Sequence, residues 1–196
     1  MAVRDDIIRK NPVDGAYAEV KKKHGGARKT RRALTVEQQR EFMSYVANSP
    51  FFYHWYPFFV LLLGTGCRIR EAIGLRWDDV DIDKRIISIN HSLTYYTRAD
   101  NQYRCEFRVS MPKTEAGIRE IPMMEPVYQM LKEEYEYQEE NGFCTATIDG
   151  MTNFIFSNRF GTPHNPQAVN RAIKRIVDAH NAEKKLKQRN RRENLL

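Results

Sequence analysis

The stretch Gly64-Thr65-Gly66-Cys67-Arg68-Ile69-Arg70-Glu71-Ala72-Ile73-Gly74-Leu75-Arg76-Trp77-Asp78-Asp79-Val80-Asp81 decides the expected fold. It follows a mostly apolar run that begins at Phe51 or Pro57 and ends at Leu63, and this run predicts a buried helix that the first glycines terminate. A short helix containing Glu71 comes next, and we expect Gly74 to close it in the left-handed conformation. A turn over 77–81 then leads into strand-forming sequence. The order predicts helices packed around a small sheet.

Three further helices are expected on either side of this stretch. Thr35 and Gln38 form a capping box that opens a helix ending near residue 48. Apolar residues recur at helical spacing over 125–141. Asn165, followed by a proline, caps a last helix that is expected to end at residue 182.

Strand composition appears in three segments, which are Arg85–Ile89, Tyr103–Val109 and Ile118–Ile121. Gly117 suggests a tight hairpin connection between the last two. Phe154–Phe156 is expected to be a short buried extended segment, and His164 is expected at the surface. The predicted fold class is mixed, mainly α with a small three-stranded antiparallel sheet.

Charge is distributed unevenly along the chain. The net charge is +7, and residues 1–32 alone hold ten Lys or Arg against four Asp or Glu. A second basic segment covers 183–193, and the middle is mildly acidic. Basic arms suggest a polyanionic partner, although solvated tails explain the charge equally well. The candidate DNA-backbone contacts are Lys21, Lys22, Lys23, Arg28, Lys29, Arg31 and Arg32.

Several classes of protein are not favoured. The N-terminus reaches charged residues before any apolar stretch, so it does not resemble a signal peptide, and the apolar run after Phe51 is too short to span a bilayer. The three cysteines lack the paired spacing of a zinc or redox motif. We therefore expect no membrane association, no metal and a reducing, cytoplasmic setting.

The stretch that begins at Gly64 resembles the first signature box of tyrosine recombinases, the phage integrase family. That box has the pattern thr-gly-x-arg-x-x-glu, followed by leu-x-trp-x-asp-ile-asp. The resemblance implies that Arg68 is the first catalytic arginine, whose guanidinium would hold two oxygens of a DNA phosphate. Glu71 lies three residues later on the same helical face and would hold Arg68 in position.

A second match lies in Pro112-Lys113-Thr114-Glu115-Ala116-Gly117-Ile118-Arg119-Glu120-Ile121-Pro122. It resembles the family's hairpin turn, in which a lysine precedes thr and the chain returns through arg-x-ile-pro. The resemblance implies that Lys113 is the general acid that protonates the departing deoxyribose oxygen. Without the resemblance, Lys113 would be an ordinary exposed loop lysine.

The family's second box, his-x-x-arg, does not occur in this sequence, and none of the ten tyrosines occupies the position of the family's nucleophile. The resemblance therefore implies a truncated catalytic domain that is inactive alone. The implied segments are the end of a core-binding domain (1–11), a basic interdomain linker (12–32), the N-terminal part of the catalytic domain (33–182) and a basic C-terminal tail (183–196).

The parent protein implied by this resemblance integrates and excises DNA through a 3′-phosphotyrosyl intermediate, without a cofactor. Integrases of conjugative transposons are the most similar type. Its partners would be double-stranded DNA and other recombinase protomers, with no small-molecule substrate. Two alternatives remain open, a non-catalytic DNA-binding truncation and a structural protein with basic tails. Salt-dependent DNA binding separates the first alternative from the second.

Overall fold

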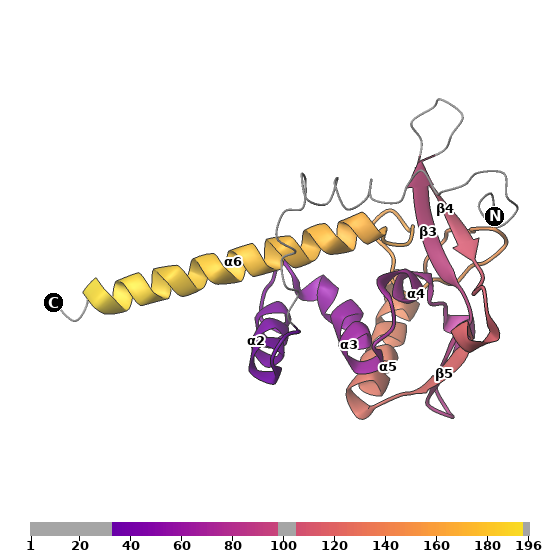
Figure 1. Ribbon diagram of the computed structural model, residues 1–196, viewed down its shortest axis with the longest axis horizontal. Coiled ribbons are helices and arrows are strands. Elements are labelled where there is room, and N and C mark those ends of the chain that lie inside the picture. The colour runs from indigo at the N-terminus through magenta and orange to yellow at the C-terminus, as the bar shows by residue number, and fades with distance from the viewer. Residues whose placement is uncertain (1–32, 98–104, 194–196) are drawn as a thin grey trace, which may run out of the picture. The chain divides into compact units, whose positions relative to one another are not determined.

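The computed structural model describes residues 33–97 and 105–193 (Figure 1). The architecture below is that of the second of the chain's two units, which begins at Glu37. The expected segments 1–11 and 12–32 lie outside the described residues. The expectations about their roles therefore stay predictions.

Helices make up most of the second unit. They are α2 (Val36–Ala47), the 3-10 turn η1 (Tyr53–Trp55), α3 (Tyr56–Thr65), α4 (Ile69–Gly74), the 3-10 turns η2 (Trp77–Asp79) and η3 (Glu115–Gly117), α5 (Glu125–Asn141) and α6 (Pro166–Glu193). In the described part of the chain, none of these helices combines the length and the apolar character that crossing a bilayer requires.

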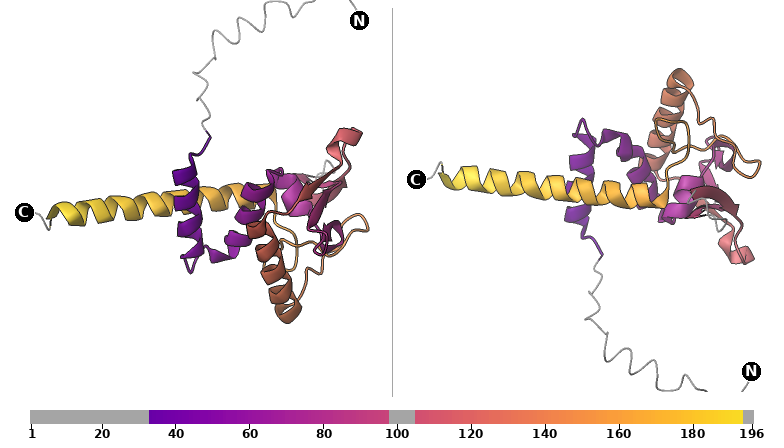
Figure 2. Two further views of the ribbon diagram at one scale, coloured as in Figure 1. Left: turned by 90° about the horizontal axis from the view of Figure 1, so that it is seen from below. Right: turned by 90° about the horizontal axis from the view of Figure 1, so that it is seen from above.

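Helix α6 begins as the sequence predicts but continues to Glu193 instead of ending at residue 182. At its start, the Ala168 N–H donates to Asn165 Oδ1 at 2.7 Å, which is the expected cap. Beyond 182 the residues are mostly Lys, Arg, Glu, Gln and Leu, which favour helix, and no glycine or proline interrupts them. Both views in Figure 2 show α6 passing α2 and continuing beyond it.

The strands form two antiparallel sheets. The first contains β1 (Val80–Asp81), β2 (Ile86–Ile89) and β5 (Arg119–Pro122) in the order β1-β2-β5, and the second pairs β3 (Ser92–Thr97) with β4 (Cys105–Ser110). The predicted small three-stranded antiparallel sheet is therefore present, and the fold is mainly helical. The strands of this three-stranded sheet differ from the expected ones, because β4 belongs to the second sheet.

Strand β4 pairs with β3, a strand that the sequence analysis did not assign. Tyr95 lies opposite Phe107 in the register, and their ring centroids are 4.7 Å apart. A cross-strand aromatic pair stabilises this nearby pairing, and closing the short intervening segment costs little entropy. The expected hairpin at Gly117 is wrong, since β4 and β5 lie in different sheets and Gly117 ends η3 instead.

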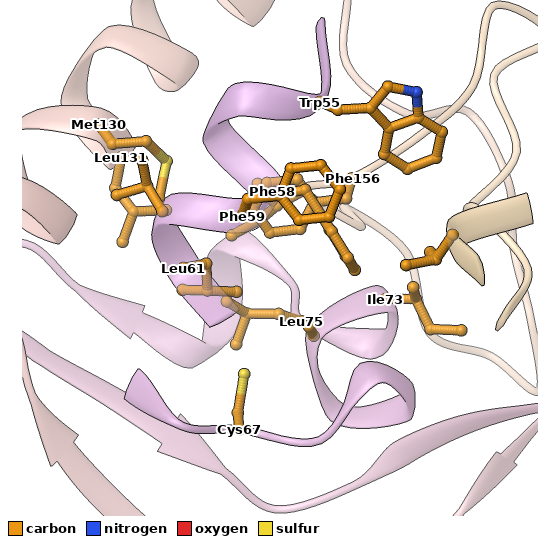
Figure 3. Packing of buried hydrophobic residues seen from close by; sticks show 14 of the residues in the cluster. Trp55, Phe58, Phe59, Leu61, Cys67, Ile73, Leu75, Met130, Leu131 and Phe156 are labelled. Carbon is orange, nitrogen blue, oxygen red and sulfur yellow. The ribbon is translucent and has the colours of Figure 1, made fainter. Parts of the chain in front are cut away.

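The hydrophobic core forms around α3, which is apolar on nearly all sides. Figure 3 shows Phe58, Phe59 and Leu61 of α3 close to Met130 and Leu131 of α5. All five side chains are buried. Burying a side chain of this size contributes about 1.5–3 kcal/mol. The core therefore fixes the end of α3, from which the chain turns directly into α4.

The two glycines that border α4 differ from the expectation. Gly66 is the left-handed residue, with φ of 64°, and its N–H donates to Leu62 O at 3.0 Å to cap α3. Gly74 remains helical, so the predicted left-handed cap there is wrong. A Cβ at Gly74 would lie 3.0 Å from the backbone nitrogen of Leu93. The glycine is needed because α4 packs closely against β3.

Candidate functional site

Arg68 occupies the N-cap position of α4, with an extended backbone (φ −73°, ψ 150°). The preceding residue, Cys67, is buried, and its side chain points into the core in Figure 3. Since neighbouring residues of an extended segment point in opposite directions, Arg68 is directed outward. Its side chain is 79% exposed. The buried Cys67 thus holds this segment against the core, while the Arg68 guanidinium is open to solvent.

Glu71 holds that guanidinium from the first turn of α4. Its Oε1 accepts a hydrogen bond from Arg68 Nη1 at 2.9 Å, and its Oε2 accepts one from the Arg68 backbone N–H, also at 2.9 Å. Glu71 is buried. A buried carboxylate that binds both the backbone and the side chain of one arginine restricts the directions that the arginine can take. Among the described residues no other partner occupies the remaining Arg68 N–H groups, which can bind an anion.

Arg119, at the start of β5, contacts the same carboxylate, and the sequence analysis assigned it no role. Its Nη2 donates to Glu71 Oε2 at 2.7 Å and its Nη1 to Glu71 Oε1 at 3.3 Å. Arg119 stands in the quoted hairpin segment, but no sequence pattern pairs it with a residue so far away along the chain. Only the pairing of β5 with β2 brings it to α4.

The hydrogen bonds from the two arginines change the pKa of Glu71. Burial by itself would raise the pKa of Glu71, but the hydrogen bonds from Arg119, the Arg68 N–H and the Arg68 side chain outweigh it, and the pKa falls to about 2. The same contacts raise the pKa of Arg119, chiefly through the hydrogen bond to Glu71. Glu71 is therefore a carboxylate at every physiological pH.

Lys113 lies exposed on the bend between β4 and η3. This loop is compact, since the Gly117 N–H donates to Thr114 O at 2.9 Å and a Cβ at Gly117 would lie only 2.5 Å from Pro112 Cβ. Arg119 follows Gly117 by two residues, which span at most about 7 Å. Connectivity therefore keeps Gly117, and the Pro112 packed against it, near the end of β5 that contacts Glu71. Within the described residues Lys113 makes no ion pair.

A buried polar network fixes the far end of α4. Asp79 accepts from Arg76 Nε and Nη2, both at 3.1 Å, and from Asn90 Nδ2 at 3.1 Å. Beside it, the Nε2 of the buried His91 lies 2.7 Å from the Gly74 carbonyl oxygen and bonds to it. The trp-x-asp part of the sequence box therefore positions α4, while the arginine and glutamate at its start face the candidate site.

The predicted DNA-backbone residues Lys21, Lys22, Lys23, Arg28, Lys29, Arg31 and Arg32 all lie outside the described residues. The other basic segment is helical where it is described. Lys184 on α6 forms an ion pair with Glu41 of α2, while Lys185 and Lys187 are exposed. Part of the predicted basic tail therefore packs against the domain.

His164 is only partly exposed, so it is more enclosed than the expected surface position implies. Its ring centroid lies 4.4 Å from that of the buried Trp55. Burial lowers the pKa of His164 to about 4, and the nearby His54 adds to this effect. The histidine therefore packs against the core at the start of α6 as a neutral ring.

A surface hollow of about 500 Å³ lies elsewhere, along η2, β1 and β2. Its lining includes Asp78, Asp81, Asp83 and Glu120 against Lys84, and neither Arg68 nor Lys113 belongs to it. An acidic lining repels a phosphate. No group of three His, Cys, Asp or Glu that could hold a metal ion occurs among the described residues. Arg68 and its neighbours therefore form the better site for an anion.

Comparisons with known proteins find relatives that match most of this chain. The transposase from transposon Tn916 of Enterococcus faecalis is 29% identical over 181 residues, which cover 92% of this chain and 42% of the transposase. The ICEBs1 integrase of Bacillus subtilis is 27% identical over 88% of this chain and 43% of its own length. The chain thus spans about two-fifths of the length of these curated relatives.

Solved structures show the same similarity. The Tn1549 transposon integrase in complex with a circular intermediate DNA matches with a TM-score of 0.79 and 31% identity, over 92% of this chain and 54% of that one. The model of the phage integrase family matches residues 32–195. With most of its length matched and its arginine box folded at the start of α4, the chain belongs to the phage integrase family.

Proposed function

We propose that this chain is part of a site-specific DNA recombinase that integrates and excises the DNA of a mobile element through a 3′-phosphotyrosyl intermediate. The relatives are a transposase and integrases, and the Tn1549 integrase was solved with DNA. One observation carries the proposal, an exposed arginine that a buried carboxylate holds rigidly at a helix start. Such an arginine is suited to bind an anion from solvent.

Arg68 binds the phosphate at which the strand is cut. Negative charge grows on the non-bridging oxygens when a nucleophile attacks phosphorus, and the two-pronged guanidinium stabilises that charge most strongly in the transition state. Glu71 leaves the outer N–H groups of Arg68 unoccupied, because it contacts only Nη1 and the backbone. Arg68 is thus oriented before DNA arrives.

Lys113 acts as the general acid. When the tyrosine oxygen forms its bond to phosphorus, the bond from phosphorus to the deoxyribose oxygen breaks, and that oxygen needs a proton to leave easily. Lys113 is exposed on a compact loop that leads into β5, and the first residue of β5 contacts the same Glu71 that holds Arg68. This sequence contains neither the family's second box nor a tyrosine at the position of its nucleophile, so we expect the chain alone to cut no DNA.

The DNA duplex and further protomers are the partners, and the bacterial cytoplasm is the setting. The net charge of +7 and the basic residues at both ends favour a duplex backbone, since bound Lys and Arg release counterions. The finer assignment to a conjugative-transposon integrase rests on the relatives. For the chain alone, the second candidate function is DNA binding without catalysis, which the lack of his-x-x-arg favours.

Two measurements test this proposal. Fluorescence anisotropy with a labelled duplex should show binding that weakens steeply as salt increases, and Arg68→Gln should weaken it about tenfold, the usual effect of losing a charged hydrogen bond. Lys132→Gln, which removes the same charge from an exposed position on α5, should change it far less. Suicide-substrate DNA should yield no covalent adduct. No DNA binding at low salt would refute the proposal.

A further inference from the structure

Glu71 is bound from two directions at once. Each of its carboxylate oxygens accepts one hydrogen bond from Arg68 and one from Arg119. The first donor caps the start of α4, and the second belongs to β5. A single buried carboxylate therefore joins the helix of the first arginine to the strand that follows the Lys113 loop.

The exposure of the two arginines indicates different tasks. The side chain of Arg68 is 79% exposed, whereas that of Arg119 is 33% exposed and directs both terminal nitrogens at Glu71. A bidentate contact is directional, since the planar fork matches the two carboxylate oxygens. The Arg119 guanidinium is thus engaged by Glu71, so it can hold Glu71 in position but has few N–H groups left to bind an external anion.

The contact between Arg119 and Glu71 also lies at the point where the Lys113 loop joins β5. Arg119 is the first residue of β5 and pairs with Ile89 of β2, so the loop joins the sheet at this residue. On the other side, Gly117 is packed against Pro112, which is the neighbour of Lys113. A short, closed segment therefore connects Arg119 to the lysine.

We propose that Arg119 is a positioning residue that couples the Lys113 loop to Arg68 through Glu71, so that the ammonium and the guanidinium face one DNA phosphate together. This inference rests on the proposed function, because it assigns Arg119 a part in that same site. Arg119 touches neither the DNA nor the reacting atoms. It acts only through Glu71.

A double-mutant cycle in DNA affinity tests the coupling. Arg119→Gln should weaken binding in the same direction as Arg68→Gln, each by up to about tenfold, and the double variant should bind about as weakly as Arg68→Gln alone. Independent factors that multiply to about 100-fold would show that Arg119 binds DNA itself and would overturn the proposal. An unchanged affinity in Arg119→Gln would overturn it as well.

Two further readouts do not depend on DNA. Arg119→Gln should move the pKa of Glu71, measured by carbon NMR, from about 2 towards its ordinary value. It should also speed hydrogen exchange at the hydrogen-bonded amides of Gly117 and Ile118 in the loop. Arg108→Gln, at an exposed position on β4, should do neither. Unchanged amide hydrogen exchange in the loop of the Arg119→Gln variant would contradict the proposed coupling of the loop to Glu71. If the wild-type chain binds no DNA, the proposed function fails while these readouts still decide the inference.

Arg119→Lys separates geometry from charge and guards against a variant that fails to fold. A lysine keeps the positive charge but cannot make the two-pronged contact. We expect it to restore thermal stability more fully than it restores slow exchange in the loop and DNA affinity. Full restoration of all three would show that charge alone is needed and would contradict the positioning role.

Discussion

Replacing Glu71 with glutamine should destabilise the domain more at neutral pH than in acid. The contacts with Arg119 and Arg68 lower the pKa of Glu71 from 4.5 to about 2. One pKa unit corresponds to 1.36 kcal/mol, so the ionised carboxylate contributes on the order of 1–3 kcal/mol to the free energy of unfolding once solvent screening is allowed for. Glutamine keeps the shape of the side chain but loses the charge that both guanidinium groups require.

The pH dependence has a fixed sign. Because the folded pKa is depressed, the stabilisation is fully present above the unfolded pKa of about 4.5 and is lost as pH falls towards 2. Urea unfolding followed by circular dichroism at pH 7, 4.5 and 3 should show the gap between wild type and Glu71→Gln closing with acid. Glu136→Gln, at an exposed position on α5, is the control. A gap below about 1 kcal/mol at pH 7, or one independent of pH, would refute this reasoning.

Three other changes test the surroundings of the site. Asp79→Ala leaves Arg76 without its buried partner and should lower the free energy of unfolding by about 3–5 kcal/mol in urea titrations; a loss under 1 kcal/mol would show that the network does not support α4. Gly74→Ala places a Cβ 3.0 Å from the Leu93 nitrogen and should cost about 1–3 kcal/mol, and an unchanged melting temperature would contradict the close α4–β3 packing. Because the pKa of His164 is lowered to about 4, the wild-type protein should lose stability as the pH falls from about 6.5 to 4. The His164→Gln variant should lose less stability over that range. Equal pH profiles would show that the surroundings of His164 do not disfavour its protonation.

Local sequence was sufficient for the elements that set up the site. The apolar run after Phe51 and the glycine-rich stretch predict α3 and its end, and the cap at Asn165 predicts the start of α6, because each depends on neighbouring residues alone. The placement of Glu71 against Arg68 also follows from helical spacing.

Features that depend on distant residues were missed. The contact of Arg119 with Glu71 arises only when β5 joins β2, and the partner of β4 is a strand whose pattern was too weak to recognise. Gly74 looked like a helix cap, but the close approach of Leu93 is what requires it. His164 looked exposed because nothing in its own segment reveals the ring of Trp55. Tertiary packing decided each of these cases.

The most direct test is a crystal structure of this chain bound to duplex DNA. Our account predicts a single backbone phosphate within hydrogen-bonding distance of both the Arg68 guanidinium and the Lys113 ammonium, with Arg119 turned away from it towards Glu71. A complex in which Arg68 and Lys113 contact different phosphates, or in which either side chain faces away from the duplex, would contradict it.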